Sequence, residues 1–391
     1  MGFVRQSLAL IGAGLLTAGA PARAEQFTTS AADALVEDYD SGAVLFEKSA
    51  DEPMAPASTA KLMTAEIVFR ELKEGRLRLD DNFDVSEKAW REGGAHSHGP
   101  AMFLSIHSHV RVEDLLRGLI IQSGNDAAIT LAEGLAGSED NFAGLMNKRA
   151  AEIGMMHSHF ANPRGKEDPS QRVTARDMAL LAAYIIRQYP EYYHYFAEKE
   201  FTWNRIRQLS RNPLLTMDIG ADGLKAGGAS EVGFALVGSA VQDNQRLILV
   251  VNGLKSATER AEESRKLFNY GFHLFEHRTL YEAGATVGTA DVYGGASGGV
   301  PLVSPQRVVL FLPRGENDKF IGKIVYDGPL VAPVATGIDV GRLKIWRNDM
   351  LVVDVPLKTG AEVALGGLPK RAFDAAIELA GGMVRRALAH Q

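Results

Sequence analysis

The sequence contains no cysteine and has only a small excess of acidic residues. Without cysteine, disulfides, thiol catalysis and thiolate metal sites are excluded. The formal net charge of -6 provides no basic surface of the kind that binds nucleic acid, so we expect no nucleic-acid partner. Unbroken apolar runs of about 20 residues, the length that crosses a bilayer, are also missing. The 391 residues, 46% of them hydrophobic, are enough for two folded domains.

The N-terminus has the pattern of a secretory signal peptide. Arg5 supplies a positive charge, Ser7 to Ala20 form a short apolar stretch, and Ala22-Arg23-Ala24 is a small-residue cleavage signal. The alternative, an N-terminal membrane anchor, is disfavoured because the apolar stretch is too short to span a bilayer comfortably. We therefore expect residues 1–24 to be removed on export, with Glu25 as the first residue of the mature chain.

The mature chain changes its pattern near Arg278. Before this point, helical and strand-like segments alternate; after it, short β-rich runs are separated by Gly and Pro, as in a small sandwich. The first part contains a predicted hairpin (Ala34–Asp38 and Ala43–Phe46), helices (Ser58–Gly75, two within Val112–Leu135, Thr174–Gln188 and Arg260–Phe275) and strands (Val232–Ala240 and Leu247–Val251). The second contains predicted strands at Val308–Leu312, Lys319–Val325, Val340–Trp346 and Leu351–Val355.

These patterns predict an α/β domain over residues 25–277 and an all-β sandwich domain over 278–368. The remaining residues, 369–391, include Lys370–His390, which is apolar on one face and charged elsewhere. That pattern predicts an amphipathic helix, weakened by Gly381-Gly382.

Ser58-Thr59-Ala60-Lys61 is the first of three polar clusters that can carry chemistry. Positions i and i+3 of a helix share a face, so the Lys61 amine can lie beside the Ser58 hydroxyl. A serine becomes a good nucleophile when a base takes its proton, and a lysine serves as that base if burial and a neighbouring cation lower its pKa. The alternative is that Ser58 caps the helix and Lys61 lies on the surface.

The other two clusters are glycine-containing. Ser123-Gly124-Asn125 separates two apolar helices as a short exposed loop, where the hydroxyl could pass a proton and the amide could hold a carbonyl. Asp222-Gly223-Leu224-Lys225-Ala226-Gly227-Gly228 opens into a strand, where Lys225 could bring positive charge to a ligand. Taken alone, each is better explained as a turn, with Lys225 on a solvated hairpin in the second case.

The three clusters in this order match the S-x-x-K, S-x-N and K-T-G pattern of β-lactamases and penicillin-binding proteins. From about Thr28 to its C-terminus, the chain resembles the low-molecular-mass penicillin-binding D-alanyl-D-alanine carboxypeptidases. The strings that carry the resemblance are Pro56-Ala57-Ser58-Thr59-Ala60-Lys61-Leu62-Met63-Thr64, Ile121-Gln122-Ser123-Gly124-Asn125-Asp126-Ala127-Ala128 and Asp222-Gly223-Leu224-Lys225, with Thr174-Ala175-Arg176-Asp177 and Asn269-Tyr270-Gly271-Phe272 as lesser ones. The implied fold is a β-lactamase/transpeptidase-like catalytic domain followed by the β domain.

The resemblance also implies a reaction and its location. Ser58 would attack the carbonyl between the last two D-alanines of a peptidoglycan stem peptide, Lys61 would accept its proton, and Ser123 would help protonate the departing D-alanine. Substrate would be held by Asn125, Lys225, Gly227 and Arg260. Water would then release the acyl-enzyme, and β-lactam antibiotics would be covalent inhibitors. The protein would be periplasmic, with residues 369–391 holding it peripherally on the outer face of the inner membrane.

The chain departs from the family pattern at the third motif. It has Ala226 where the family has threonine and Ala229 where a second threonine is usual, and the loop around Arg164–Gln171 is shorter than is typical. These changes affect the expected efficiency and substrate choice more than the nucleophile. A second Lys-Thr-Gly string, Lys358-Thr359-Gly360, follows Pro356 in the β domain, and we interpret it as a turn.

No cofactor is implied. Three His-Ser-His triplets (His96/His98, His107/His109 and His157/His159) are candidates for zinc, but none has an acidic or cysteine partner at ligand spacing, so we expect no metal site.

Two other functions remain as alternatives. A serine β-lactamase-like hydrolase is disfavoured by the lack of an acidic loop for a deacylating water and by the β domain. A non-catalytic peptidoglycan-binding relative would explain the missing threonines.

Overall fold

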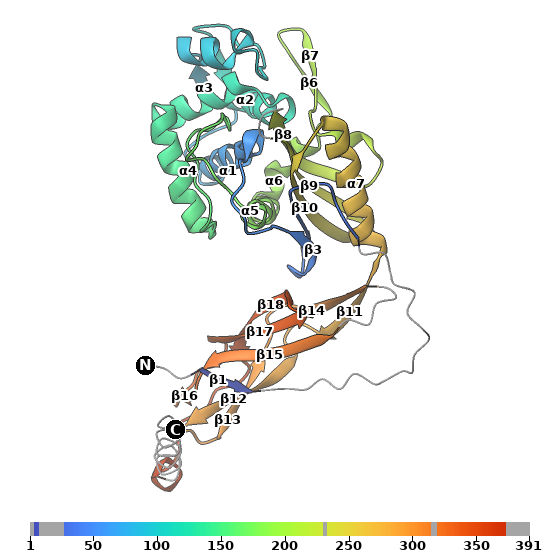
Figure 1. Ribbon diagram of the computed structural model, residues 1–391. Helices are drawn as coiled ribbons and strands as arrows, with labels where there is room; N and C mark the ends of the chain where they lie inside the picture. The colour runs from blue at the N-terminus through green and yellow to red at the C-terminus, as the bar shows by residue number, and fades with distance from the viewer. Residues whose placement is uncertain (1–3, 8–26, 230–232, 314–318, 373–391) are drawn as a thin grey trace, which may run out of the picture. The chain divides into compact units, whose positions relative to one another are not determined.

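A five-stranded sheet forms the centre of the first part of the chain (Figure 1). Its strand order is β3-β2-β10-β9-β8, and β8 is an edge strand. The strands are β2 (Asp33–Asp38), β3 (Val44–Lys48), β8 (Ala221–Ala229), β9 (Gly233–Gln242) and β10 (Gln245–Leu254). The six central residues of both β9 and β10 are buried without alternation, because both faces of the sheet are covered.

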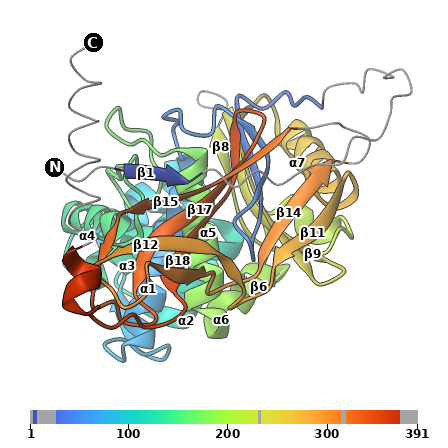
Figure 2. The same ribbon diagram turned by 90° about the horizontal axis from the view of Figure 1, so that it is seen from below.

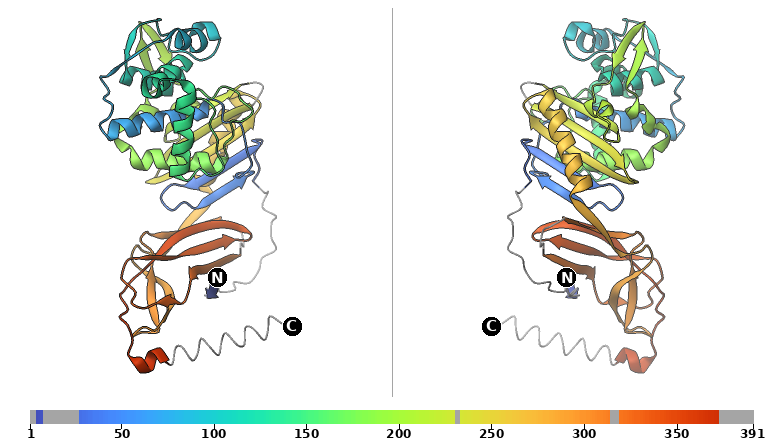
Figure 3. Two further views of the ribbon diagram at one scale, coloured as in Figure 1. Left: turned by 90° about the vertical axis from the view of Figure 1, so that its left-hand side faces the viewer. Right: turned by 90° about the vertical axis from the view of Figure 1, so that its right-hand side faces the viewer.

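Helices cover the two faces of this sheet. Helix α7 (Ala257–His273) packs against β9 and β10 on one face, and α5 (Ala175–Gln188) packs against β2 and β10 on the other (Figures 1 and 3). The side chain of Thr174 accepts a hydrogen bond from the backbone N–H of Asp177, so Thr174 is the N-cap of α5 and the predicted helix begins where expected.

The remaining elements of this unit are helices, single helical turns and two small strand pairs. The other helices are α1 (Lys61–Lys73), α2 (Val112–Arg117), α3 (Asn125–Ala136), α4 (Glu139–Ile153) and α6 (Pro190–Tyr193). The helical turns are η1 (Ala57–Ala60), η2 (Ala89–Gly93), η3 (Ala95–Ser97), η4 (Gly118–Gln122), η5 (His194–Ala197) and η6 (Pro213–Thr216). Two small antiparallel pairs are β4 (Asn82–Asp84) with β5 (His109–Arg111), and β6 (Glu200–Trp203) with β7 (Ile206–Leu209).

The computed structural model describes residues 4–7, 27–229, 233–313 and 319–372. Among the described residues, the first compact unit contains 27–40 and 45–274, and the second contains 4–7, 41–44 and 275–372. Most of the predicted amphipathic helix and, except for Val4–Ser7, the predicted signal peptide lie outside the described residues. No helix in the described part of the chain is both long and apolar enough to cross a membrane.

The second unit contains only strands apart from its last described residues. Its main sheet has the order β1-β15-β17-β18-β13-β12-β16, and β11 pairs with β14 in a second sheet (Figure 2). The strands are β1 (Val4–Ser7), β11 (Phe275–Tyr281), β12 (Thr286–Tyr293), β13 (Gly299–Val303), β14 (Val308–Pro313), β15 (Phe320–Asp327), β16 (Leu330–Val331), β17 (Asp339–Arg347) and β18 (Met350–Thr359). Inward residues of both sheets, among them Val300, Leu310 and Leu357, share one core inside a nearly closed barrel. The predicted fold class, α/β followed by all-β, is therefore confirmed.

The second Lys-Thr-Gly string is not a turn, as the sequence suggested, but the end of β18. The Thr359 hydroxyl donates to the carbonyl of Ala335 at 2.6 Å and accepts from the N–H of Ile338 at 3.2 Å. Thr359 is buried, so its hydroxyl joins a neighbouring loop to the strand end.

Candidate active site

Ser58 lies in η1, a 3-10 turn that leads directly into α1. Three residues per turn bring i and i+3 into line, and the Nζ of Lys61 is 3.2 Å from the Oγ of Ser58. The alternative in which Ser58 caps the helix is wrong: α1 begins at Lys61, its N-cap is Ala60, and no side chain caps it. The Ser58 hydroxyl, on a half-buried residue, is thereby left for chemistry.

The Lys61 amine faces three oxygens. Its Nζ is 2.6 Å from the carbonyl of Arg164, 2.8 Å from the Oδ1 of Asn125 and 3.2 Å from the Oγ of Ser58. The first two oxygens can only accept hydrogen bonds, whereas a hydroxyl can also donate. A neutral amine has two N–H groups and one lone pair, so its N–H groups satisfy the two acceptors and its lone pair is left for the Ser58 hydroxyl. In its neutral form, Lys61 is placed to take the serine proton.

The surroundings favour that neutral form. Lys61 is 1% exposed, and burial lowers its pKa to about 7, with the charge of Arg164 as the next cause. The carboxylate of Asp126 acts in the opposite direction. A large share of the molecules therefore carries an uncharged Lys61 near neutral pH, as a lysine base requires.

Ser123 lies between η4 and α3, and Asn125 is the first residue of α3. Ser123 has a left-handed backbone (φ 65°), and its Oγ is buried with no hydrogen-bond partner among the described residues. The sequence predicted an exposed loop here, but the segment around Met102 covers it. The Asp126 carboxylate accepts hydrogen bonds from the N–H groups of Met102 and Leu104 and so holds that segment in place.

Strand β8 carries the third motif past η1, the turn that contains Ser58 and is called the nucleophile turn below. A Cβ added to Gly227 would lie 2.9 Å from the backbone nitrogen of Thr59 and 3.1 Å from that of Ser58. Lys225 is 2% exposed, and its Nζ donates to the carbonyl of Ile120 at 3.0 Å. Burial, and then the charge of Lys61, lower the pKa of Lys225 well below its ordinary value. Because β8 is an edge strand, its outer backbone groups can pair with an extended ligand.

Two arginines add positive charge. Arg260 of α7 donates to the carbonyl of Gly227 at 3.0 Å, and burial followed by the charge of Arg211 lowers its pKa to about 10. Arg211, which the sequence analysis did not select, donates through Nε to the carbonyl of Gln122 at 2.9 Å. Its charge also lowers the pKa of Lys61 and of Lys225. The only sequence signal for Arg211 was a basic residue preceding the third motif, which is too common to be informative.

The predicted site residues thus meet at one place, beside a cleft of about 390 Å³. The cleft is lined by Ser58, Arg91, Glu92, Ser97, Asn125, Arg164, Gly165 and Lys166. This volume suits a short peptide or another small ligand. A half-buried hydroxyl, a neutral amine and a group of cations can together attack a carbonyl and hold an anionic ligand.

The histidine triplets do not join this chemistry. His96 packs against the ring of Trp90, His109 pairs with Asp84, and the Nδ1 of His159 lies 3.1 Å from the carbonyl of Ser170. Among the residues that the structure describes, no three His, Asp or Glu side chains gather as a metal ion would need.

Comparisons with known proteins give matches over nearly the whole chain. A family model described as D-alanyl-D-alanine carboxypeptidase matches residues 20–256, and one described as the C-terminal domain of penicillin-binding protein 5 matches residues 275–364. The D-alanyl-D-alanine carboxypeptidase DacC of Escherichia coli is 40% identical over 343 residues, 87% of this chain and 86% of that protein.

Solved structures agree with these matches. Penicillin-binding protein 5 from Haemophilus influenzae has a TM-score of 0.75 and 36% identity, covering 87% of this chain and 99% of that one. Penicillin-binding protein D2 from Listeria monocytogenes, in its ampicillin-bound form, has a TM-score of 0.55 and 29% identity, covering 63% of this chain and 99% of that one.

Proposed function

The chain belongs to the D-alanyl-D-alanine carboxypeptidase family and is a serine peptidase of that type, and from this premise we propose that Ser58 is its nucleophile. The substrate is the D-alanyl-D-alanine end of a peptidoglycan stem pentapeptide. The observation that carries the proposal is the placement of the buried Lys61 amine, whose lone pair is left for the Ser58 hydroxyl.

In the first half of the reaction, Ser58 Oγ bonds to the carbonyl carbon between the two D-alanines while its proton passes to Lys61. The C–N bond then breaks, and the Ser123 hydroxyl relays a proton from Lys61 to the departing amine. D-alanine leaves, and the rest of the peptide remains as an ester on Ser58. Water attacks the ester with Lys61 again as the base, and the serine is restored.

Substrate binding uses the residues around the cleft. The Asn125 side-chain N–H₂ group is available to a substrate carbonyl, since its oxygen accepts from Lys61. Arg260, with Arg211 as an addition, supplies positive charge for the terminal carboxylate. The bound carboxylate raises the pKa of the buried Lys225 again, so Lys225 joins them in holding it. Gly227 lets the edge of β8 approach the substrate backbone closely.

We also propose that β-lactams acylate Ser58. A related penicillin-binding protein has been solved with ampicillin bound, and the same nucleophile and base suit both kinds of carbonyl.

For location, we propose export by a signal peptide over residues 1–24 to the periplasm and peripheral contact with the inner membrane through residues 369–391. Removal of the signal peptide would also remove β1, which pairs with the edge of β15. The proposed domains are 25–277 for catalysis and 278–368 for the β domain.

The test is covalent labelling. Intact-protein mass spectrometry should find one penicillin adduct on the natural protein and none on Ser58→Ala. Lys61→Ala should fold and acylate about 10²–10⁴-fold more slowly, because the general base is gone. An adduct that persists in Ser58→Ala rejects the nucleophile.

Product analysis separates the alternatives. Release of D-alanine from a pentapeptide supports the carboxypeptidase. Rapid turnover of penicillin without D-alanine release would instead identify a β-lactamase-like hydrolase, and the lack of any adduct would identify a non-catalytic relative.

A further inference from the structure

A short segment of backbone, residues 163–165, packs against both the turn that contains Ser58 and the side chain of Lys61. The Thr64 hydroxyl donates to the carbonyl of Pro163 at 2.8 Å, and the Lys61 amine donates to that of Arg164 at 2.6 Å. Gly165 has a φ of 74°, and a Cβ there would lie 1.8 Å from the carbonyl oxygen of Ala57. The position of this segment therefore sets where the Lys61 amine finds one of its two acceptors.

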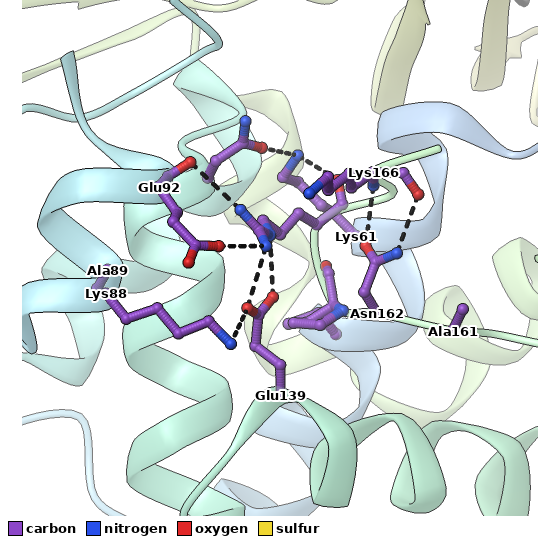
Figure 4. Close-up of polar contacts among 12 residues, drawn as sticks. Lys61, Lys88, Ala89, Glu92, Glu139, Ala161, Asn162 and Lys166 are labelled. Atoms are coloured by element: carbon purple, nitrogen blue, oxygen red, sulfur yellow. Dashed lines mark hydrogen bonds and ion pairs between the residues drawn. The ribbon is translucent and has the colours of Figure 1, made fainter. Parts of the chain in front are cut away.

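The side chain of Arg164 anchors the segment from the other direction. It is 8% exposed and binds Glu139 with both ends of its fork, Nε to Oε2 at 2.9 Å and Nη2 to Oε1 at 3.1 Å. It also donates to the carbonyl and to the carboxylate of Glu92, at 3.2 Å each. Lys88 completes the cluster through Glu139 at 2.9 Å, and Figure 4 shows Lys88, Glu92 and Glu139 converging.

The two carboxylates belong to elements that are fixed elsewhere. Glu139 opens α4, where it occupies the first turn. Glu92 lies in η2, and the adjoining Gly93 packs so closely on the start of α3 that a Cβ would be 2.4 Å from the nitrogen of Asp126. Through Glu92, Arg164 is thus tied to the element that carries Asn125, the second acceptor of the Lys61 amine.

We propose that Arg164 is a positioning residue, whose side chain, held by Glu139 and Glu92, fixes its own carbonyl against Lys61 and so aims the Lys61 lone pair at Ser58. The inference rests on the proposed role of Lys61 as the base. Arg164 differs from an ordinary member of a buried ion pair in two ways. Its backbone carbonyl accepts a hydrogen bond from Lys61, and its side-chain charge lowers the pKa of Lys61.

Because the Arg164 charge acts on the pKa of Lys61, the proposal predicts the direction in which that pKa moves when a charge is removed. Lys61 is faced by Arg164 from this segment, Asp126 from α3, Arg211 from the segment after β7 and Lys225 from β8. Loss of the Arg164 cation raises the pKa of Lys61. Loss of the Glu139 anion leaves Arg164 and Lys88 less compensated and lowers it. The two substitutions therefore move the pH dependence in opposite directions.

The experiment measures the second-order rate constant for acylation by a fluorescent penicillin between pH 5 and 10 on the full chain. In the plot of this rate constant against pH, the rise reflects deprotonation of Lys61. Arg164→Met should shift that rise to higher pH, and Glu139→Gln should shift it to lower pH. Both should lower the alkaline plateau by about tenfold to a hundredfold, because the amine is no longer aimed. Arg164→Lys keeps the charge but loses the two-pronged contact of the guanidinium with Glu139. The pH of the rise should therefore stay in place, while the rate constant at the alkaline plateau falls.

Arg176→Met is the matched control. Arg176 is also held by two carboxylates, Glu47 and Asp51, but it is not among the charges that act on Lys61, so its rise and plateau should match those of the natural protein. Thermal unfolding identifies variants that fold. If Arg164→Met does not fold, the isosteric Glu139→Gln and the charge-conserving Arg164→Lys carry the test.

Unchanged plateaus, or rises that move in the same direction, would overturn the proposal. Arg164 variants that behave normally beside an inactive Lys61→Ala would remove this inference and leave the proposed function intact. A fully active Lys61→Ala would instead remove the proposed base.

Discussion

Ala226 lies between Lys225 and Gly227 on β8, at the position where the K-T-G pattern has threonine. It is 5% exposed and contributes no hydrogen bond from its side chain. In the proposed binding mode, the terminal carboxylate of the substrate is then held without help from a hydroxyl at this position. A hydrogen bond to a charged group contributes about 1.5–3 kcal/mol, so the missing hydroxyl has a measurable cost.

Replacing Ala226 by threonine should raise kcat/KM for D-alanine release from a pentapeptide by roughly tenfold to a hundredfold, at about 1.4 kcal/mol per decade. Penicillin acylation should change less, because the strained ring supplies much of its driving force. Ala226→Ser, with a smaller side chain, controls for crowding at this buried position. A threonine variant that is no faster on pentapeptide would show that the hydroxyl is irrelevant or that the site serves another ligand.

Single residues also show where prediction from sequence ends. Ser58 and Lys61 are three residues apart, and local helical geometry was enough to pair them. Arg164 binds Glu139 and Glu92, which are 25 and 72 residues away in sequence. No local pattern encodes such contacts, because they depend on how separate elements pack. For the same reason, Arg211 emerged only from the three-dimensional arrangement.

At the scale of elements, β8 shows how packing overrides local preference. Glycine is unfavourable within strands, and the glycine-rich third motif was expected to lead into a strand rather than to form one. It is a nine-residue strand. Its glycines allow the strand to run against η1, where Gly227 approaches the backbone of Ser58 and Thr59.

Gly227→Ala should reduce penicillin acylation at least tenfold. The new methyl would lie 2.9 Å from the backbone nitrogen of Thr59, so either β8 or the nucleophile turn must move. Overpacking of this kind costs about 1–3 kcal/mol of stability, which thermal unfolding will report beside the rate.

Gly144→Ala is the control for that change. Gly144 lies within α4 with nothing within 4 Å of its added Cβ, so the variant should keep full activity and gain slightly in stability. Normal acylation by Gly227→Ala would contradict the close approach of β8 to the turn.

The boundaries of two strands followed closely from the sequence. Val308–Leu312 and Val340–Trp346 were predicted within one residue of β14 and β17 at each end. A short continuous apolar run marks the first strand, and alternation of apolar and polar residues marks the second. The 3-10 turn before α1 and the π-helical turn η4 were missed. Their sequences are compatible with an ordinary helix, so no local pattern distinguishes them from one.

At the scale of the whole molecule, the two units have separate cores, and the proposed catalytic residues all belong to the first. Deletion of residues 370–391 should therefore move the protein from the membrane to the soluble fraction without loss of penicillin acylation. A full-length chain carrying Ile377→Ser and Val384→Ser tests the apolar face alone and should weaken membrane binding in the same direction. An unchanged membrane fraction after the deletion would rule out the anchor.

The cations around Ser58 belong to a chain whose formal net charge is -6. In a medium of physiological ionic strength, the screening length is about 8 Å, little more than the width of a side chain and its first water layer. The field of Arg211 and Arg260 thus fades within a short distance of the site, and an anionic wall fragment is not drawn in from a distance. The association rate is therefore set by diffusion, and the buried charges act on the dissociation rate of the bound fragment.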